Sequence, residues 1–110
     1  MVCSKSEVII ADTLARFGVP YRYEQELYLK GLGSVHPDFN CLNTRTRSEF
    51  LWEHEGMMDD PGYASTSIQR EDAYIENDYY PGVNLIITRE TLDHPLDTHQ
   101  IESLIQRFLL

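Results

Sequence analysis

The segment from His36 to Gly56 constrains this chain most, because it predicts a β-hairpin that gathers carboxylates on one face. A turn over residues 44–47 pairs Asp38 with Glu53 across the two strands. Directly opposed residues of an antiparallel pair have Cβ atoms about 5 Å apart, so two like charges repel there. Side chains alternate along a strand, which places Glu55 on the same face as Glu53. The pattern predicts a compensating positive charge, for which a divalent cation with oxygen ligands is the simplest candidate.

The composition predicts one folded domain over residues 1–110. A chain of 110 residues suits a single hydrophobic core, and 42% hydrophobic residues favour a globule over a disordered chain. Two cysteines, Cys3 and Cys41, make no disulfide framework and show no metal-ligand spacing, which favours a reduced, cytoplasmic setting. We expect no membrane partner, because the sequence has neither an apolar run of membrane-spanning length nor a signal-peptide pattern.

The periodicity and the helix caps predict seven elements. They are helices over residues 5–17, 61–77 and the segment after residue 97, and strands over residues 21–29, 34–42, 49–54 and 83–88. Ser4 and Glu7 form a capping box before the first helix. Asp60 followed by Pro61 is typical of a helix start, and Asp97 with Gln100 caps the last helix. The order α-β-β-β-α-β-α predicts an α/β fold.

This order, with particular residues in particular places, resembles the PD-(D/E)xK nuclease superfamily. The matches are Glu7 in the first helix, Pro37-Asp38 on the second strand and Glu53-x-Glu55 on the third. The resemblance covers the whole chain, and it implies the restriction-endonuclease-like αβββαβ core, which is a mixed central sheet flanked by helices, with an added C-terminal helix. More narrowly, phrases such as Trp52-Glu53-His54 resemble a bacterial group of that superfamily. In that group this unit is similar to the C-terminal part of a longer protein, so an excised C-terminal domain is compatible with the sequence.

The resemblance implies hydrolysis of phosphodiester bonds, expected in DNA, by a metal-activated water. It assigns Asp38, Glu53 and the backbone carbonyl of His54 as metal ligands, and Glu7 as a residue that completes the site from the first helix. Mg²⁺ is the expected ion, with Mn²⁺ as a substitute, because Mg²⁺ prefers oxygen ligands and keeps several waters. Glu7 has an alternative explanation as a capping residue only, with its carboxylate on the Ser4 amide.

Glu55 departs from the family pattern, which usually has a lysine at that position to orient or activate the attacking water. Some members of the superfamily carry a glutamate there and use it as a metal ligand or base. Alternatively, Lys5 or Lys30 supplies the positive charge from a neighbouring element, or hydrolysis is weak or lost. Glu55 could also be a solvated residue at the end of its strand.

Several residues are candidates for contact with nucleic acid. Arg70 and Tyr74 are four apart on the second helix and so share a face. In related nucleases such a pair helps to position DNA; an ordinary surface stack is the alternative. Arg45 and Arg47 at the hairpin tip, and Lys5, are further candidates for phosphate contact.

The charge balance limits what this domain does alone. Eighteen acidic and nine basic residues give a net charge of −9, so we expect weak, salt-dependent binding to nucleic acid. An upstream segment or a homo-oligomer would have to supply the grip. Three functions stay open: a Mg²⁺-dependent nuclease domain, a catalytically inactive nuclease-fold module for binding or assembly, and an acidic cluster that binds a cation structurally.

Overall fold

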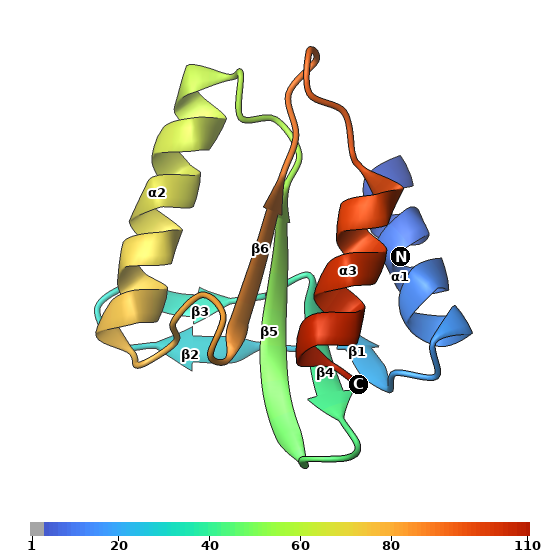
Figure 1. Ribbon diagram of the computed structural model, residues 1–110. Helices are drawn as coiled ribbons and strands as arrows, with labels where there is room; N and C mark the ends of the chain where they lie inside the picture. The colour runs from blue at the N-terminus through green and yellow to red at the C-terminus, as the bar shows by residue number, and fades with distance from the viewer. Residues whose placement is uncertain (1–3) are drawn as a thin grey trace.

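The computed structural model describes residues 4–110, which form a mixed α/β structure (Figure 1). Its elements in chain order are α1 (Lys5–Arg16), β1 (Tyr21–Tyr23), β2 (Leu27–Leu29), β3 (Gly33–Val35), β4 (Phe39–Asn43), β5 (Ser48–Glu55), α2 (Pro61–Glu76), β6 (Leu85–Arg89) and α3 (Thr98–Phe108). Four strands form one sheet in the order β1-β4-β5-β6, and β2 and β3 form a separate two-stranded ribbon. The predicted α/β class is confirmed.

The connections explain the strand directions. A short turn joins β4 to β5, and these strands are antiparallel. Asn40 lies opposite Leu51 and Leu42 opposite Glu49, which is the register that the predicted pairing of Asp38 with Glu53 implies. The longer connection through α2 joins β5 to β6, and these strands are parallel, as a helical crossover allows. The sheet is therefore mixed, and β5 lies inside it with a partner on each side.

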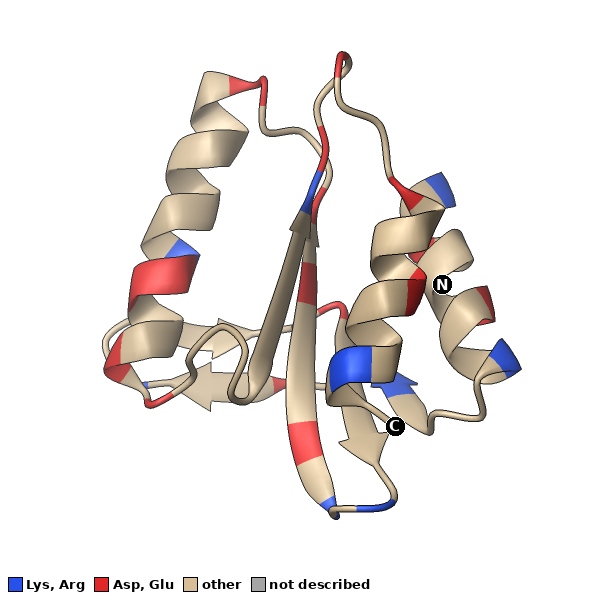
Figure 2. Cartoon of the chain, in the orientation of Figure 1, with Lys and Arg blue, Asp and Glu red and all other residues tan. Residues whose placement is uncertain are grey.

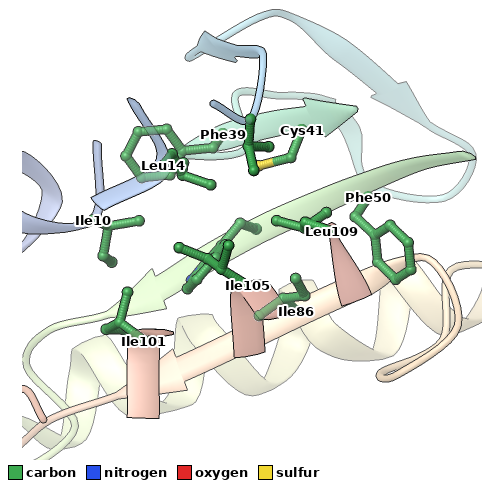
Figure 3. Close-up of a cluster of buried hydrophobic side chains, with 11 residues drawn as sticks. Ile10, Leu14, Phe39, Cys41, Phe50, Ile86, Ile101, Ile105 and Leu109 are labelled. Carbon is green, nitrogen blue, oxygen red and sulfur yellow. The ribbon is translucent and has the colours of Figure 1, made fainter. Parts of the chain in front are cut away.

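Helices cover both faces of the sheet, with α2 on one side and α1 and α3 on the other (Figure 1). Alternate residues of β4 and β5 point into the core beneath α1 and α3. Phe39, Cys41 and Phe50 are labelled in Figure 3, and Trp52 belongs to the same cluster. The intervening residue Leu51 packs instead with Ala73 and Tyr74 of α2. The predicted division of the hairpin into two faces is confirmed.

The predicted caps position the helices. The Ser4 hydroxyl accepts the Glu7 backbone N–H at 3.1 Å, which begins α1 at the predicted residue. Asp60 caps α2 by accepting the Tyr63 N–H, with Pro61 at the first helical position. Asp97 caps α3. The capped start of α2 follows shortly after the end of β5 in the chain. The first turn of this helix therefore lies beside the end of β5 that carries Glu53 and Glu55.

The predicted strand over residues 21–29 is wrong in extent, because Glu24 breaks it into β1 and β2. The φ angle of Glu24 is 51°, in the left-handed region that is unfavourable for residues with a side chain. Its backbone N–H donates to the Asp38 carbonyl at 3.1 Å. The chain thus leaves the main sheet at Glu24, and β2 pairs with β3 instead.

The predicted strand over residues 34–42 is also wrong in extent. β3 ends at Val35, and β4 begins only at Phe39. Pro37 has no N–H for a strand ladder, and Asp38 lies in a bend just before β4. The observed order therefore contains the β2–β3 ribbon as an insertion into the predicted α-β-β-β-α-β-α order.

The charged residues are unevenly distributed (Figure 2). Arg45 and Arg47 lie in the turn between β4 and β5, which is at the opposite end of β5 from the start of α2.

None of the described helices has the length and hydrophobicity needed to cross a membrane. Cys41 is a buried thiol, and Cys3 lies outside the described residues.

Candidate active site

Asp38 and Glu53 meet where β4 begins and β5 nears its end. The Asp38 carboxylate Oδ2 accepts the backbone N–H of His54 at 2.7 Å, which holds it beside the residue that follows Glu53. Burial and the neighbouring Glu53 carboxylate raise the pKa of Asp38 from 3.8 to about 7, and Glu7 adds to the same effect. The direction of this shift is the one that the predicted repulsion between the two acids requires.

Glu53 is buried between the sheet and α2, with 5% of its surface exposed. Its Oε1 accepts a hydrogen bond from the Tyr74 hydroxyl at 2.9 Å, and its Oε2 accepts one from Arg70 Nη1 at 3.1 Å. Burial still raises the pKa of Glu53, although Arg70 and Tyr74 act to lower it. Arg70 and Tyr74 thus share one face of α2 as predicted, and they serve as partners of Glu53 rather than as a surface stack.

Glu55 points to the same side as Glu53 and is also buried. Its Oε1 accepts Arg89 Nε at 2.8 Å, and Arg89 Nη2 donates to Glu71 of α2 at 3.0 Å. Burial and the nearby Glu71 raise the pKa of Glu55 to about 8. The interpretation of Glu55 as a solvated strand end is wrong. Its counter-charge comes from Arg89 at the end of β6, opposite Glu55 in the parallel register.

Glu7 contributes to the helix cap, through the Ser4 hydroxyl rather than the predicted Ser4 amide. One carboxylate oxygen accepts the Ser4 hydroxyl at 2.9 Å, within the helix cap. The other accepts the Tyr23 hydroxyl at 2.6 Å, across to β1. Because Glu7 also raises the pKa of Asp38, it lies at the edge of the acidic site as well as in the cap.

The other predicted basic residues lie apart from these carboxylates. Arg45 Nη2 donates to the Leu110 carbonyl at 3.1 Å, and Arg47 occupies the turn with a φ of 66°. An extended strand rises about 3.3 Å per residue, so Arg47 lies roughly 20 Å from Glu53 along β5. Lys5 is exposed in the first turn of α1, two residues before Glu7, and residues so spaced do not share a helix face.

A small pocket lies between β5 and α2, and sequence analysis missed four residues that line it: Tyr63, Thr66, Ser67 and Glu71. The Tyr63 hydroxyl accepts the Gly56 N–H at 3.0 Å, directly after Glu55. A usable signal was present, because residues 63, 67, 70 and 74 are spaced by four, three and four, which is one face of a helix. Extending the Arg70–Tyr74 face one turn at a time towards the start of α2 would have identified Tyr63 and Ser67.

A second missed group lies on the other face of β5. The His54 ring is buried, with Nδ1 2.8 Å from Thr88 Oγ1 and Nε2 2.6 Å from Glu90 Oε1. The Trp52 indole N–H also donates to Thr88 Oγ1, at 3.1 Å, and the Ser6 hydroxyl donates to Glu90. His54 thus points away from Glu53, and its ring contacts Thr88 of β6 and Glu90, to which Ser6 of α1 also donates.

The acidic residues offer a partial donor set for a metal ion. Within residues 4–110, no three His, Cys, Asp or Glu side chains are arranged to hold one. Asp38 and Glu53 supply two carboxylates, and Mg²⁺ bound by one or two carboxylates keeps waters in its remaining positions. The repulsion that raises the pKa of Asp38 is what a cation would relieve, so these residues fit Mg²⁺ as a two-carboxylate site. Comparisons with protein-family models, with curated proteins and with solved structures found no match to this chain.

Proposed function

We propose that this chain is a metal-dependent nuclease domain that hydrolyses phosphodiester bonds of DNA. The observation that carries the proposal is the placement of Asp38 beside Glu53, where burial and mutual repulsion raise the pKa of Asp38 to about 7. Two carboxylates kept close together against their repulsion are typical of a cation site. The sequence resemblance to the PD-(D/E)xK superfamily, with its restriction-endonuclease-like fold, supports the same function.

In this proposal Asp38, Glu53 and the His54 carbonyl hold Mg²⁺ or Mn²⁺. The bound ion supplies a water of lowered pKa and neutralises charge that builds up on the phosphate. The protein keeps Asp38 in place through the His54 N–H. Arg70 and Tyr74 fix the orientation of the Glu53 carboxylate from α2.

The test compares DNA cleavage by the wild type, Glu53→Ala and the matched control Glu49→Ala. Glu49 is an exposed carboxylate on the same strand, so its loss removes one negative charge without touching the site. With Mg²⁺ or Mn²⁺, and with the upstream segment or homo-oligomer that supplies the grip on DNA, we expect the wild type and Glu49→Ala to cut, and Glu53→Ala to lose at least about a hundredfold in rate. Equal residual cleavage by the wild type and Glu53→Ala would contradict the nuclease proposal.

Glu55 variants separate the roles left open for this residue. Glu55→Ala should lower the cleavage rate strongly if Glu55 replaces the usual lysine in function. Glu55→Lys restores the commoner motif, but it places a cation next to Arg89, so we expect it to need Arg89→Ala as a second change to fold well. Circular dichroism melts of each variant check that a loss of rate is not a loss of folding.

A catalytically inactive nuclease-fold module is the second candidate, and a specific observation favours it. Glu53 and Glu55 already have arginine partners, Arg70 and Arg89, at 3.1 and 2.8 Å. These pairs supply part of the positive charge that a metal would otherwise provide. In that case the domain serves binding or assembly, and DNA binding without metal-dependent cleavage is the expected result. A net charge of −9 disfavours DNA binding by this domain alone. In both functions, most of the binding affinity for DNA therefore comes from an upstream segment or a homo-oligomer.

A further inference from the structure

Tyr63 lies in the first turn of α2, where the helix passes the end of β5. Its hydroxyl oxygen accepts the backbone N–H of Gly56 at 3.0 Å. The side chain is half-buried and lines the same pocket as Glu53, Glu55 and Arg70. The hydrogen bond to Gly56 therefore fixes the position of the hydroxyl in the lining of this pocket.

The hydrogen of this hydroxyl distinguishes Tyr63 from the two other tyrosines around the acidic residues. Tyr74 donates its hydroxyl hydrogen to Glu53, and Tyr23 donates to Glu7. A tyrosine hydroxyl has one hydrogen to donate and can also accept. Tyr63 is an acceptor towards Gly56, and among residues 4–110 its hydroxyl donates to no protein group. Its hydrogen is therefore left for a ligand or water in the pocket.

The charges around Tyr63 keep it a neutral donor. Burial and the nearby carboxylates of Asp38, Glu55 and Glu53 raise the pKa of Tyr63 above its ordinary value. The hydroxyl thus stays protonated at neutral pH. Arg70, the cation of this pocket, is engaged by Glu53 at 3.1 Å. An anionic group entering between these carboxylates would meet Tyr63 as an available donor.

We propose that the Tyr63 hydroxyl donates a hydrogen bond to a non-bridging oxygen of the phosphodiester bound at this site. Tyr63 is then a substrate-binding residue, placed by its own contact with Gly56. This inference rests on the proposed nuclease function, because that function supplies the phosphodiester. It adds a residue of α2 that neither the sequence motif nor the Arg70–Tyr74 pair includes.

The test measures binding of the dinucleotide d(TpT) in millimolar Mg²⁺ by the wild type, Tyr63→Phe and the control Tyr28→Phe. Tyr28 is 71% exposed on β2 and lies outside the pocket. Because a hydrogen bond to a charged group is worth about a tenfold change in affinity or somewhat more, we expect Tyr63→Phe to bind roughly tenfold more weakly. Tyr28→Phe should bind as the wild type does.

A second measurement does not depend on the variant folding fully. In wild-type protein with isotopically labelled tyrosine, the Cζ resonance of Tyr63 should move on addition of d(TpT), while that of Tyr28 stays in place. If the wild type binds d(TpT) but Tyr63→Phe binds equally well, or the Tyr63 resonance does not move, this inference is wrong and the nuclease proposal stands. If the wild type neither binds d(TpT) nor cuts DNA, both proposals are wrong.

Discussion

Asp38 is the residue at which folding and the proposed function oppose each other most clearly. Its carboxylate is half-buried and receives one backbone N–H, from His54. Glu53 and Glu7 both disfavour its ionised form, and Arg70 only partly offsets them. A group in that setting destabilises the folded chain when it ionises, and a bound cation would reverse the effect.

The first prediction follows from the raised pKa of Asp38, 3.8 ordinarily and about 7 in the folded chain. Between these pH values the folded state holds a proton that the unfolded state has released. The free energy of unfolding therefore falls as pH rises through this window. Without divalent metal, Asp38→Asn should match the wild type near pH 4 and exceed it by on the order of 1 kcal/mol at pH 8.

Thermal melts in a chelator, from pH 4 to pH 8, measure this difference between Asp38→Asn and the wild type. Asparagine keeps an oxygen for the His54 N–H, so the comparison isolates the charge. Glu49→Gln, at an exposed position of β5, should differ from the wild type by the same small amount at every pH. A pH-independent difference for Asp38→Asn would show that Asp38 is ionised throughout.

At the scale of elements, the parts set by local chemistry were predictable and those set by distant partners were not. Caps and apolar periodicity are local signals, and they gave the starts of all three helices. The break at Glu24 was not predictable, because a strained φ of 51° is held by a hydrogen bond to Asp38, fourteen residues further on. Local β-propensity at Tyr21 to Leu29 favoured one continuous strand.

The residues of the candidate site also fall into those that local sequence predicts and those that depend on a distant partner. Asp38 and Glu53 followed from the register of one hairpin, which a short turn determines. Arg89 as the partner of Glu55 depends on the parallel register of β5 and β6, which α2 sets through a long crossover. Charge pairs across such a crossover leave no periodic trace in the sequence.

The turn between β4 and β5 carries the second prediction. Arg47 has a φ of 66° there, a conformation that costs a residue with a side chain roughly 1 kcal/mol or more. Arg47→Gly should therefore stabilise the fold by about 0.5 kcal/mol, after the greater chain entropy of glycine is subtracted. Arg47→Ala keeps the strain and should give no gain.

Denaturant midpoints of the two variants measure this difference. The same pair tests the predicted phosphate contact of Arg47, because both changes remove the guanidinium. If Arg47 contacts DNA, both variants should weaken binding equally and reduce its dependence on salt. A loss in neither variant would remove Arg47 from the nucleic-acid surface.

At the scale of the whole molecule, a net charge of −9 works against any polyanionic partner. Basic residues are sparse in Figure 2, and two of them are engaged by Glu53 and Glu55 within the site. A divalent cation would therefore act at two levels. It would relieve repulsion within the site, and it would lower the field that DNA meets on approach.

The last prediction is that millimolar Mg²⁺ or Mn²⁺ stabilises the folded chain at neutral pH. A ligand that binds only the folded state adds RT ln(1 + [L]/Kd), about 2.7 kcal/mol when its concentration is a hundred times Kd. For a domain of this size, each kcal/mol raises Tm by roughly 4–8 °C, so we expect a shift of several degrees. Sodium chloride at matched ionic strength controls for general screening of the acidic surface. Asp38→Asn should lose most of the metal-dependent shift, and Glu49→Gln should keep it.

An equal shift in Tm for the wild type, Asp38→Asn and Glu49→Gln would mean that the ion only screens the surface. A shift that Asp38→Asn loses, in a protein that does not cleave DNA, would mean that the acidic cluster binds a structural cation.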